Sequence, residues 1–323
     1  MRSNKILIIG SLPPPIGGVS IHVQRLLHHL EKNGILYKYI DLKTSSKSSI
    51  IIKIFSHNRI HLHCSNVFLR FMMTFFGVIF LKKIDFTLHG DLGRYNSKFK
   101  NALDLLSIYL SNTPILLNQK SYSKAKRYNR NSILGSSFYS PNYEKEVLRK
   151  DIMKSILEHK NKFQFQFCTN AYNLSFDKDN HEIYGLFELI ELFAIYSQFS
   201  LVISDPSGAY QNAILNKKII LSENILLISC QHSFYKVIEL SDGMIRNTTT
   251  DGDSISVKEG LYLNKLVYCT SVVERPKESI IYKKGTFISI LQKQQFLKQD
   301  VKAHYSKQDF EKKMFENILL YKL

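Results

Sequence analysis

Short apolar runs alternate with stretches of helical periodicity along most of the chain, and this alternation constrains the fold more than any other feature. The run KILIIG at 5–10 precedes a helix-period stretch at 18–33, and RIHLHC at 59–64 and IDFTLH at 84–89 flank another at 67–81. A strand–helix–strand rhythm with short connections makes the strands parallel and places helices on both faces of the sheet. The sequence therefore predicts an α/β fold.

The rhythm occurs in two blocks, separated by the polar segment 141–162. In the second block we expect strands at 163–168, 200–204, 218–222, 225–229, 243–246 and 266–270. A length of 323 residues suits two domains. We expect two Rossmann-like doubly wound domains facing a central cleft, at 1–140 and 163–300, joined by a linker at 141–162. Residues 301–323 are expected to form a C-terminal helix, with packing against the first domain as one option.

The positive charge is concentrated in the first half of the chain. Residues 1–140 hold 20 Lys and Arg against 5 Asp and Glu, a net charge of +15, out of +17 for the whole chain. Such an excess favours an anionic partner, namely a nucleic acid, a phosphate-bearing ligand or an acidic lipid surface. A lysine-rich solvated surface is the alternative. We expect no nucleic-acid partner, because the chain has no recognition motif or aromatic–basic repeat.

The apolar segment NVFLRFMMTFFGVIFLKK at 66–83 raises the question of a membrane. Only 11 residues separate Arg70 from Lys82, whereas a bilayer-spanning helix needs roughly 20. The first interpretation is a buried helix, and the second is a helix in the membrane interface, with Arg70, Lys82 and Lys83 at lipid phosphates. The opening MRSNKILIIG runs directly into a strand, and the four cysteines form no CxxC pair, so we expect a cytoplasmic, reduced protein.

The loop GSLPPPIGG at 10–18 connects the first strand to the first helix. Free N–H groups at a helix start favour anions, so this is the usual position for a phosphate group. The loop does not fit G-x-G-x-x-G, which disfavours a dinucleotide-dependent dehydrogenase. Prolines stiffen the loop, while Gly17 and Gly18 allow a ligand to approach the backbone.

The stretch PPPIGGVSIHVQRLLHHLEKNG resembles the N-terminal signature of GT-B glycosyltransferases of glycosyltransferase family 4. Further resemblances follow in the family's order: HLHCSN at 61–66, FTLHGD at 86–91, YGLFELIELF at 184–193 and DGMIRNTTTDGDSISVKEGLYLNKLVYCT at 242–270. The resemblance implies a retaining, metal-independent hexosyltransferase-type enzyme. It would transfer a sugar from a nucleotide-sugar donor, with a UDP-sugar favoured and no cofactor.

The last of these stretches is where the family carries two acidic residues that hold the donor. Glu259 matches the second, which in the family binds the ribose hydroxyls, and a carboxylate suits a vicinal diol. Asp251 stands where the family has a glutamate beside the transferred sugar, and the resemblance implies a catalytic role for it. Around Asp251 lies a loop whose residues are also expected to bind the donor: Thr250, Gly252, Asp253 and Ser254. The backbone amides of 252–256 are expected to cradle the diphosphate. Asp253 or Ser254 can equally be a helix N-cap.

His89 and Arg246 complete the predicted site. His89 matches a family histidine that approaches the donor sugar, and we expect it to be catalytic, with a hydrogen-bonded core histidine as the alternative. The family's Arg and Lys, which neutralise the diphosphate, are absent at the expected place, and Lys178 or Arg246 are the candidate replacements. Although Asp251–Gly252–Asp253 resembles a metal-binding DxD, we expect no metal, because two carboxylates alone make a poor Mg²⁺ cage.

We therefore expect a glycosyltransferase that acts on a lipid-linked or saccharide acceptor in bacterial surface polysaccharide synthesis, such as O-antigen, capsule or exopolysaccharide. Its basic first domain predicts peripheral attachment to an acidic membrane at the cytoplasmic face of the inner membrane. The alternatives are a sugar-nucleotide epimerase on the same architecture and a catalytically degenerate scaffold protein.

Overall fold

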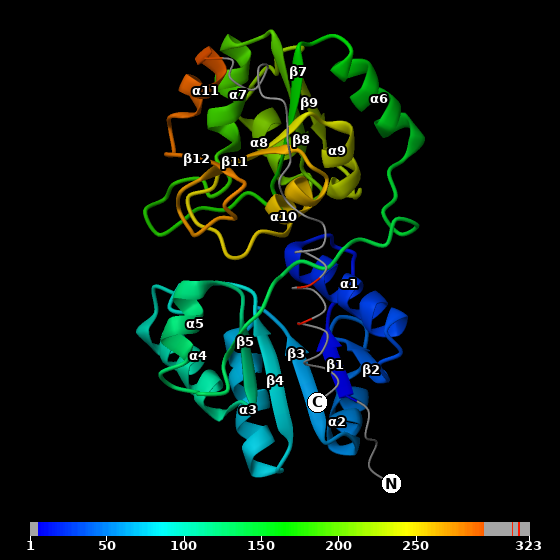
Figure 1. Ribbon diagram of the computed structural model, residues 1–323, viewed down its shortest axis with the longest axis vertical. Coiled ribbons are helices and arrows are strands. Elements are labelled where there is room, and N and C mark those ends of the chain that lie inside the picture. The colour runs from blue at the N-terminus through cyan, green and yellow to red at the C-terminus, as the bar shows by residue number, and fades with distance from the viewer. Residues whose placement is uncertain (1–5, 294–311, 313–315, 317–323) are drawn as a thin grey trace. The chain divides into compact units, whose positions relative to one another are not determined.

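The computed structural model describes residues 6–293, together with Lys312 and Glu316. These residues form two compact units that divide between Ser140 and Pro141 (Figure 1). Each unit holds one six-stranded, fully parallel sheet. The predicted α/β class with two doubly wound domains is therefore confirmed. The helix expected at 301–323 lies outside the described residues, except for the two isolated helical positions.

Unit 1 is built on a sheet with the strand order β2-β1-β3-β4-β5-β6. Its elements in chain order are β1 Ile6–Gly10, α1 Gly18–Lys32, β2 Tyr37–Asp41, α2 Lys47–Ser56, β3 Arg59–His63, α3 Val67–Ile79, β4 Lys83–Leu88, α4 Lys98–Leu110, β5 Thr113–Leu116, α5 Gln119–Ala125 and β6 Ile133–Leu134. The strand order reverses between β1 and β3, and in parallel α/β sheets ligands bind beyond the carboxyl ends of the strands at such a point.

The first strand shows why the sheet is covered on both faces. Ile6 and Ile8 pack with Val23 and its neighbours on α1, whereas Leu7 and Ile9 pack in a separate cluster that includes Met73 of α3. Successive strand residues point to opposite faces, so an uninterrupted apolar strand needs a helix on each side. This explains the continuous apolar run that the sequence shows.

Unit 2 has the strand order β12-β11-β10-β7-β8-β9, and its order reverses between β7 and β10. Its elements are α6 Lys150–Lys160, β7 Phe165–Asn170, α7 Leu186–Ile195, β8 Phe199–Ser204, α8 Ala209–Asn216, β9 Ile225–Ile228, α9 Phe234–Leu240, β10 Gly243–Arg246, α10 Ile255–Tyr262, β11 Leu266–Thr270, β12 Ile280–Tyr282 and α11 Phe287–Lys293. This is the dinucleotide-type Rossmann order.

Two segments of unit 2 differ from the sequence-based expectation. The stretch 141–162, expected as a linker, contains helix α6, whose Ile152 and Ile156 are buried. The strand expected at 218–222 does not form. Lys218 has a left-handed φ of 54° and the Ile219 N–H donates to the Ile214 carbonyl, so the apolar run is the exit of α8.

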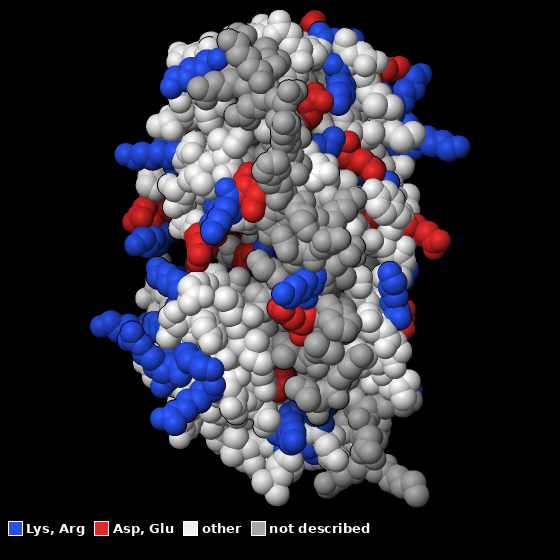
Figure 2. All heavy atoms as spheres, viewed as in Figure 1, with Lys and Arg blue, Asp and Glu red and all other residues white. Residues whose placement is uncertain are grey.

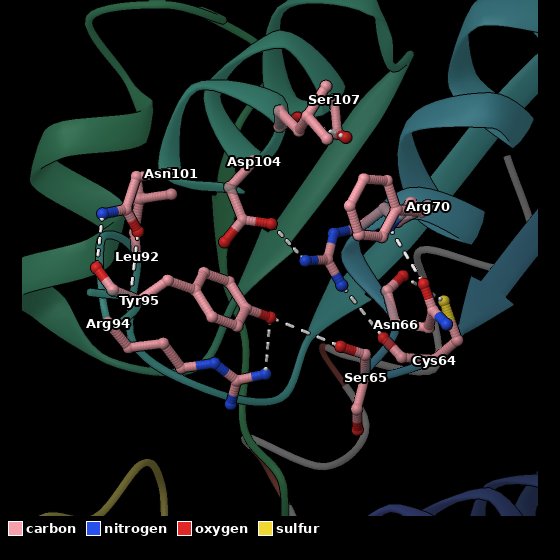
Figure 3. Close-up of polar contacts among 12 residues, drawn as sticks. Cys64, Ser65, Asn66, Arg70, Leu92, Arg94, Tyr95, Asn101, Asp104 and Ser107 are labelled. Atoms are coloured by element: carbon pink, nitrogen blue, oxygen red, sulfur yellow. Dashed lines mark hydrogen bonds and ion pairs between the residues drawn. The ribbon is translucent and has the colours of Figure 1, made fainter. Parts of the chain in front are cut away.

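Arg70 of α3 is buried, which corrects its expected place at lipid phosphates. Its guanidinium forms an ion pair with Asp104 of α4 and donates to the Cys64 carbonyl at 3.0 Å (Figure 3). Both side chains of the pair are 1% exposed. Arg70 therefore ties the end of β3 to α4, inside the unit.

Candidate functional site

An arginine–aspartate–arginine cluster lies beyond the carboxyl end of β10, at the switch point of unit 2. Arg246 Nε and Nη2 donate to the two carboxylate oxygens of Asp251 at 2.9 and 3.0 Å. Arg275, in the loop after β11, donates to Asp251 Oδ2 at 2.9 Å. The three side chains are only 11%, 8% and 3% exposed for Arg246, Asp251 and Arg275. The site thus concentrates a net positive charge in a largely desolvated place.

Burial and charge act in opposite directions on this cluster. Desolvation raises the pKa of Asp251, but the charges and hydrogen bonds of Arg246 and Arg275 outweigh it and bring the pKa below its usual value. Asp251 is therefore an anion at neutral pH. Its Oδ1 also accepts a hydrogen bond from the Gly252 N–H at 3.1 Å, so both of its oxygens are occupied.

The neighbouring strand and loop orient Arg246 further. Its Nη1 donates to Asn170 Oδ1 at 3.3 Å, across the β7–β10 switch point, and its guanidinium lies 5.3 Å from the ring of Tyr184. The structure places Arg246 beside them and adds Arg275. Lys178, the other candidate, lies on an exposed turn after β7.

The loop between β10 and α10 leads into a helix without a side-chain cap. Ser254 occupies the N-cap position, yet it makes no cap hydrogen bond, and its Oγ instead lies 3.1 Å from Ser256 Oγ. Asp253 forms an ion pair with Lys258. Both acidic residues of the DxD-like stretch thus pair with cations.

Glu259 and Thr250 lie at opposite extremes of burial. Glu259 faces inward on α10 and is 4% exposed, whereas Thr250 is exposed in the preceding loop. The helix packs closely here, because a Cβ at Gly260 would come within 2.7 Å of Val267 on β11. The predicted ribose ligand is thus held rigidly, one turn into α10.

In unit 1, the proline-rich loop is tied to the start of α1. Ser20 Oγ accepts a hydrogen bond from the Gly17 N–H at 3.0 Å and lies 2.9 Å from the Pro15 carbonyl oxygen, to which it donates. A Cβ added at Gly18 would meet nothing within 4 Å. Packing within the chain therefore does not require glycine at 18, and the space beside it is open to an outside group.

Four histidines gather near the carboxyl ends of β1, β3 and β4. His61 and His63 of β3 stack with ring centroids 4.4 Å apart, and His61 Nε2 lies 2.9 Å from Thr87 Oγ1. His22 of α1 and His89, just after β4, lie 5.2 and 5.5 Å from the His63 ring. Burial lowers the pKa of His63 and His89 well below the usual value, and that of His61 to about 3. These imidazoles are neutral.

Sequence reasoning named His89 but missed two of its companions as site residues. His22 and His63 were not named, and neither was Arg275 in unit 2. The signal for Arg275 was its position in the loop that follows β11 Leu266–Thr270, at the sheet edge where ligands bind. Among the described residues, two groups have the ligand spacing for a metal ion: His22–His63–His89 and Asp177–Asp179–His181. In the second, Asp177 Oδ1 accepts hydrogen bonds from the N–H groups of Asp179 and His181, as in a turn.

Solved structures similar to this chain are glycosyltransferases. The Anabaena protein HepE in complex with UDP-glucose has 10% sequence identity and a TM-score of 0.67, over 98% of this chain and 99% of that one. The lipopolysaccharide outer core galactosyltransferase WaaB has 13% identity and a TM-score of 0.59, over 99% and 100%. WaaG, a glycosyltransferase of lipopolysaccharide biosynthesis, has 10% identity and a TM-score of 0.59, over 98% and 94%.

No protein-family model matches the chain, and neither does any curated protein. At these identities the similarity establishes the fold, which is the GT-B fold that the sequence predicted.

Proposed function

We propose that this protein is a retaining glycosyltransferase that uses a nucleotide-sugar donor, with a UDP-sugar as the favoured co-substrate and no further cofactor. The observation that carries the proposal is the pair of guanidinium groups, Arg246 and Arg275, at the switch point of a Rossmann-ordered sheet. Cations held in a desolvated place stabilise the charge that builds on a leaving diphosphate. The complexes of HepE with UDP and UDP-glucose support the same class of donor.

Within unit 2 we assign the diphosphate to the two arginines and to the start of α10. The N-cap of α10 lacks a side-chain hydrogen bond, and the N-terminus of a helix favours an anion. We keep Glu259 as the ribose ligand. For Asp251 we propose a positioning role, because its oxygens are taken by guanidinium and backbone N–H groups.

Within unit 1 we keep Gly17, Gly18 and His89 as donor contacts. Because the imidazole of His89 is neutral, it suits hydrogen bonding to a sugar hydroxyl rather than charge neutralisation. The transfer itself then depends mainly on aligning the acceptor hydroxyl with the anomeric carbon.

The test is a thermal-unfolding panel with UDP-, GDP-, ADP- and dTDP-sugars. A ligand at 100 times its dissociation constant stabilises the native state by about 2.7 kcal/mol. We expect one nucleotide class to raise the unfolding midpoint of the wild type and of Glu191→Ala, an exposed acidic position on α7, but not of Glu259→Ala. Absence of any shift in a folded sample would contradict donor binding and favour a degenerate scaffold. Conversion of the donor to a second sugar nucleotide without an acceptor would favour an epimerase.

We also propose that unit 1 binds an acidic membrane and that the acceptor is a lipid-linked or other saccharide in surface polysaccharide synthesis. No helix among the described residues has the length and apolar character to span a bilayer. Helices α2, α3 and α4 and the two residues after α3 nevertheless expose large apolar side chains: Ile51, Ile52, Phe55, Phe68, Met72, Phe75, Phe76, Val78, Ile79, Phe80, Leu81, Phe99, Leu106 and Tyr109. Exposed apolar surface of this extent marks an interaction site.

Basic residues accompany this apolar surface. Lys120, Lys124, Lys126, Arg127 and Arg130, on α5 and just after it, are all exposed, and Figure 2 shows Lys and Arg gathered over α4 and α5. Apolar side chains with nearby cations suit a bilayer of anionic lipids.

Vesicle flotation tests the membrane proposal. We expect the protein to float with phosphatidylglycerol-containing vesicles at physiological salt, and Phe75→Ser combined with Phe76→Ser to abolish flotation. Ile220→Ser, which replaces an even more exposed apolar residue of unit 2, should leave it intact. Failure of the wild type to float, or concentration-dependent dimerisation through the same residues, would contradict the proposal.

A further inference from the structure

The three histidines at the switch point of unit 1 have the spacing of ligands on a single metal ion. One ring nitrogen from each of His22, His63 and His89 lies within 4.8 Å of the other two, and His63 Nδ1 is 3.3 Å from His89 Nε2. Nitrogens bound to a tetrahedral ion at about 2.0–2.1 Å stand about 3.3 Å apart. The observed separation of that nitrogen pair therefore equals the separation that a shared ion requires.

The ring positions agree with the nitrogen spacing. On a tetrahedral ion, three imidazole centroids lie about 5.2 Å from one another, since each centroid is roughly 1.1 Å beyond its ligand nitrogen. The observed centroid separations are 4.8 Å for His22–His89, 5.2 Å for His22–His63 and 5.5 Å for His63–His89. Interplanar angles of 78°, 46° and 45° show that the three rings are not stacked on one another.

The hydrogen-bond contacts of the ring nitrogens also suit metal binding. His22 Nδ1 lies 2.8 Å from the Ser137 carbonyl, which only accepts hydrogen bonds, so His22 donates from Nδ1 and its Nε2 carries the lone pair. A metal-bound histidine typically donates its other N–H to such a carbonyl. His63 would ligate through Nδ1, the ring nitrogen that lies 3.3 Å from His89 Nε2.

We propose that His22, His63 and His89 form a three-histidine site for a divalent transition-metal ion, with Zn²⁺ as the expected occupant. Imidazole ligands favour Zn²⁺, Co²⁺ and Ni²⁺ over Mg²⁺ and Ca²⁺, which prefer oxygen. Three protein ligands leave the fourth position of a tetrahedral ion to water or a ligand. The least buried of the three, His89, lies on the solvent side of the cluster. This site revises our expectation of a chain without a metal.

A consequence for catalysis rests on the proposed function. If His89 also contacts the donor sugar, a bound ion and the sugar hydroxyl compete for the same imidazole. Zn²⁺ would then inhibit transfer, and a chelator would restore it.

The test uses the full-length, untagged protein and measures metal binding directly, without donor or acceptor. Co²⁺ is titrated at pH 7.5 and followed by the visible absorption of a tetrahedral ion, and Zn²⁺ is then added to displace it. We expect saturation at one equivalent and full displacement. His22→Asn and His89→Asn should each weaken binding by more than the roughly 10- to 100-fold that loss of a second-shell partner causes. His28→Asn, on the same helix α1, should bind like the wild type.

Two results would overturn the site. One is the absence of saturable Co²⁺ absorption in the folded wild type. The other is an unchanged affinity in His22→Asn and His89→Asn, which would place the ion elsewhere, for example at Asp177–Asp179–His181. Circular dichroism verifies the fold of each variant. The titration contains no nucleotide sugar, so its failure would contradict the metal site alone and would leave the proposed donor binding to be tested by the thermal-unfolding panel.

Discussion

Replacing Asp251 by Asn removes the one negative charge between two guanidinium groups while nearly preserving the side-chain shape. Removal of one partner from a buried ion pair costs about 3–5 kcal/mol, because it leaves an uncompensated charge. Here Arg246 keeps Asn170 Oδ1 and the Tyr184 ring, and Arg275 keeps Thr248 Oγ1 at 3.3 Å. An asparagine oxygen also accepts one hydrogen bond, so we expect a loss of about 2–4 kcal/mol in the free energy of unfolding.

The assay is equilibrium urea unfolding followed by far-UV circular dichroism, since the chain contains no Trp. Asp253→Asn is the matched control, because it lies in the same loop but forms an ion pair with a single lysine, Lys258, whose flexible ammonium reaches solvent more easily. We expect about 1 kcal/mol for the control. If Asp251→Asn costs no more than Asp253→Asn, the reasoning on the arginine cluster is refuted.

Two further readouts separate a positioning role for Asp251 from a catalytic one. UDP should raise the unfolding midpoint of Asp251→Asn by more than that of the wild type, because the diphosphate supplies the missing counter-charge.

The second readout is the pH dependence of the free energy of unfolding, whose sign follows from the pKa of Asp251. The folded-state pKa of Asp251 is lowered, so its stabilisation is present above the unfolded value of about 3.9 and is lost as the pH falls below it. Asp251→Asn should lack that part of the acid sensitivity. A purely catalytic Asp251 predicts unchanged stability and unchanged UDP binding.

Three other changes test the packing around the two sheets. Arg70→Met should lower the free energy of unfolding of unit 1 by about 3 kcal/mol in urea titrations, since it leaves Asp104 buried without its cation. A loss below about 0.5 kcal/mol would contradict a stabilising ion pair between Arg70 and Asp104. Gly185→Ala should cost about 2 kcal/mol or more by the same assay, because Gly185 has a φ of 59° and a Cβ there would lie 2.6 Å from the Asn247 carbonyl oxygen. His232 has a pKa lowered mainly by burial, so its stabilisation is complete above about pH 6.5 and lost at lower pH. A stability-versus-pH series for His232→Asn should therefore be flatter between pH 6.5 and 4 than that of the wild type.

Much of the architecture followed from the sequence because each signal was local. Continuous apolar runs such as 5–10 and 200–204 required parallel strands covered on both faces, and β1 and β8 lie there. The strand predicted at 218–222 was wrong, because the apolar run there forms the end of α8 and the turn that follows it. It also missed α6, because two buried isoleucines among eleven residues give a weak periodic signal.

For the candidate site, too, the sequence determined some features and the tertiary structure decided others. The sequence alone determined which loops matter, because strand ends and helix starts are local features. Gly17 was named from its place in such a loop, whereas His89, Asp251 and Glu259 were named from the resemblance to the glycosyltransferase family. Only the tertiary structure decided which side chains meet. Arg275 reaches Asp251 from 24 residues away, and His22 and His89 join His63 from three different elements. Such contacts depend on the strand order at the two switch points, which no local pattern in the chain encodes.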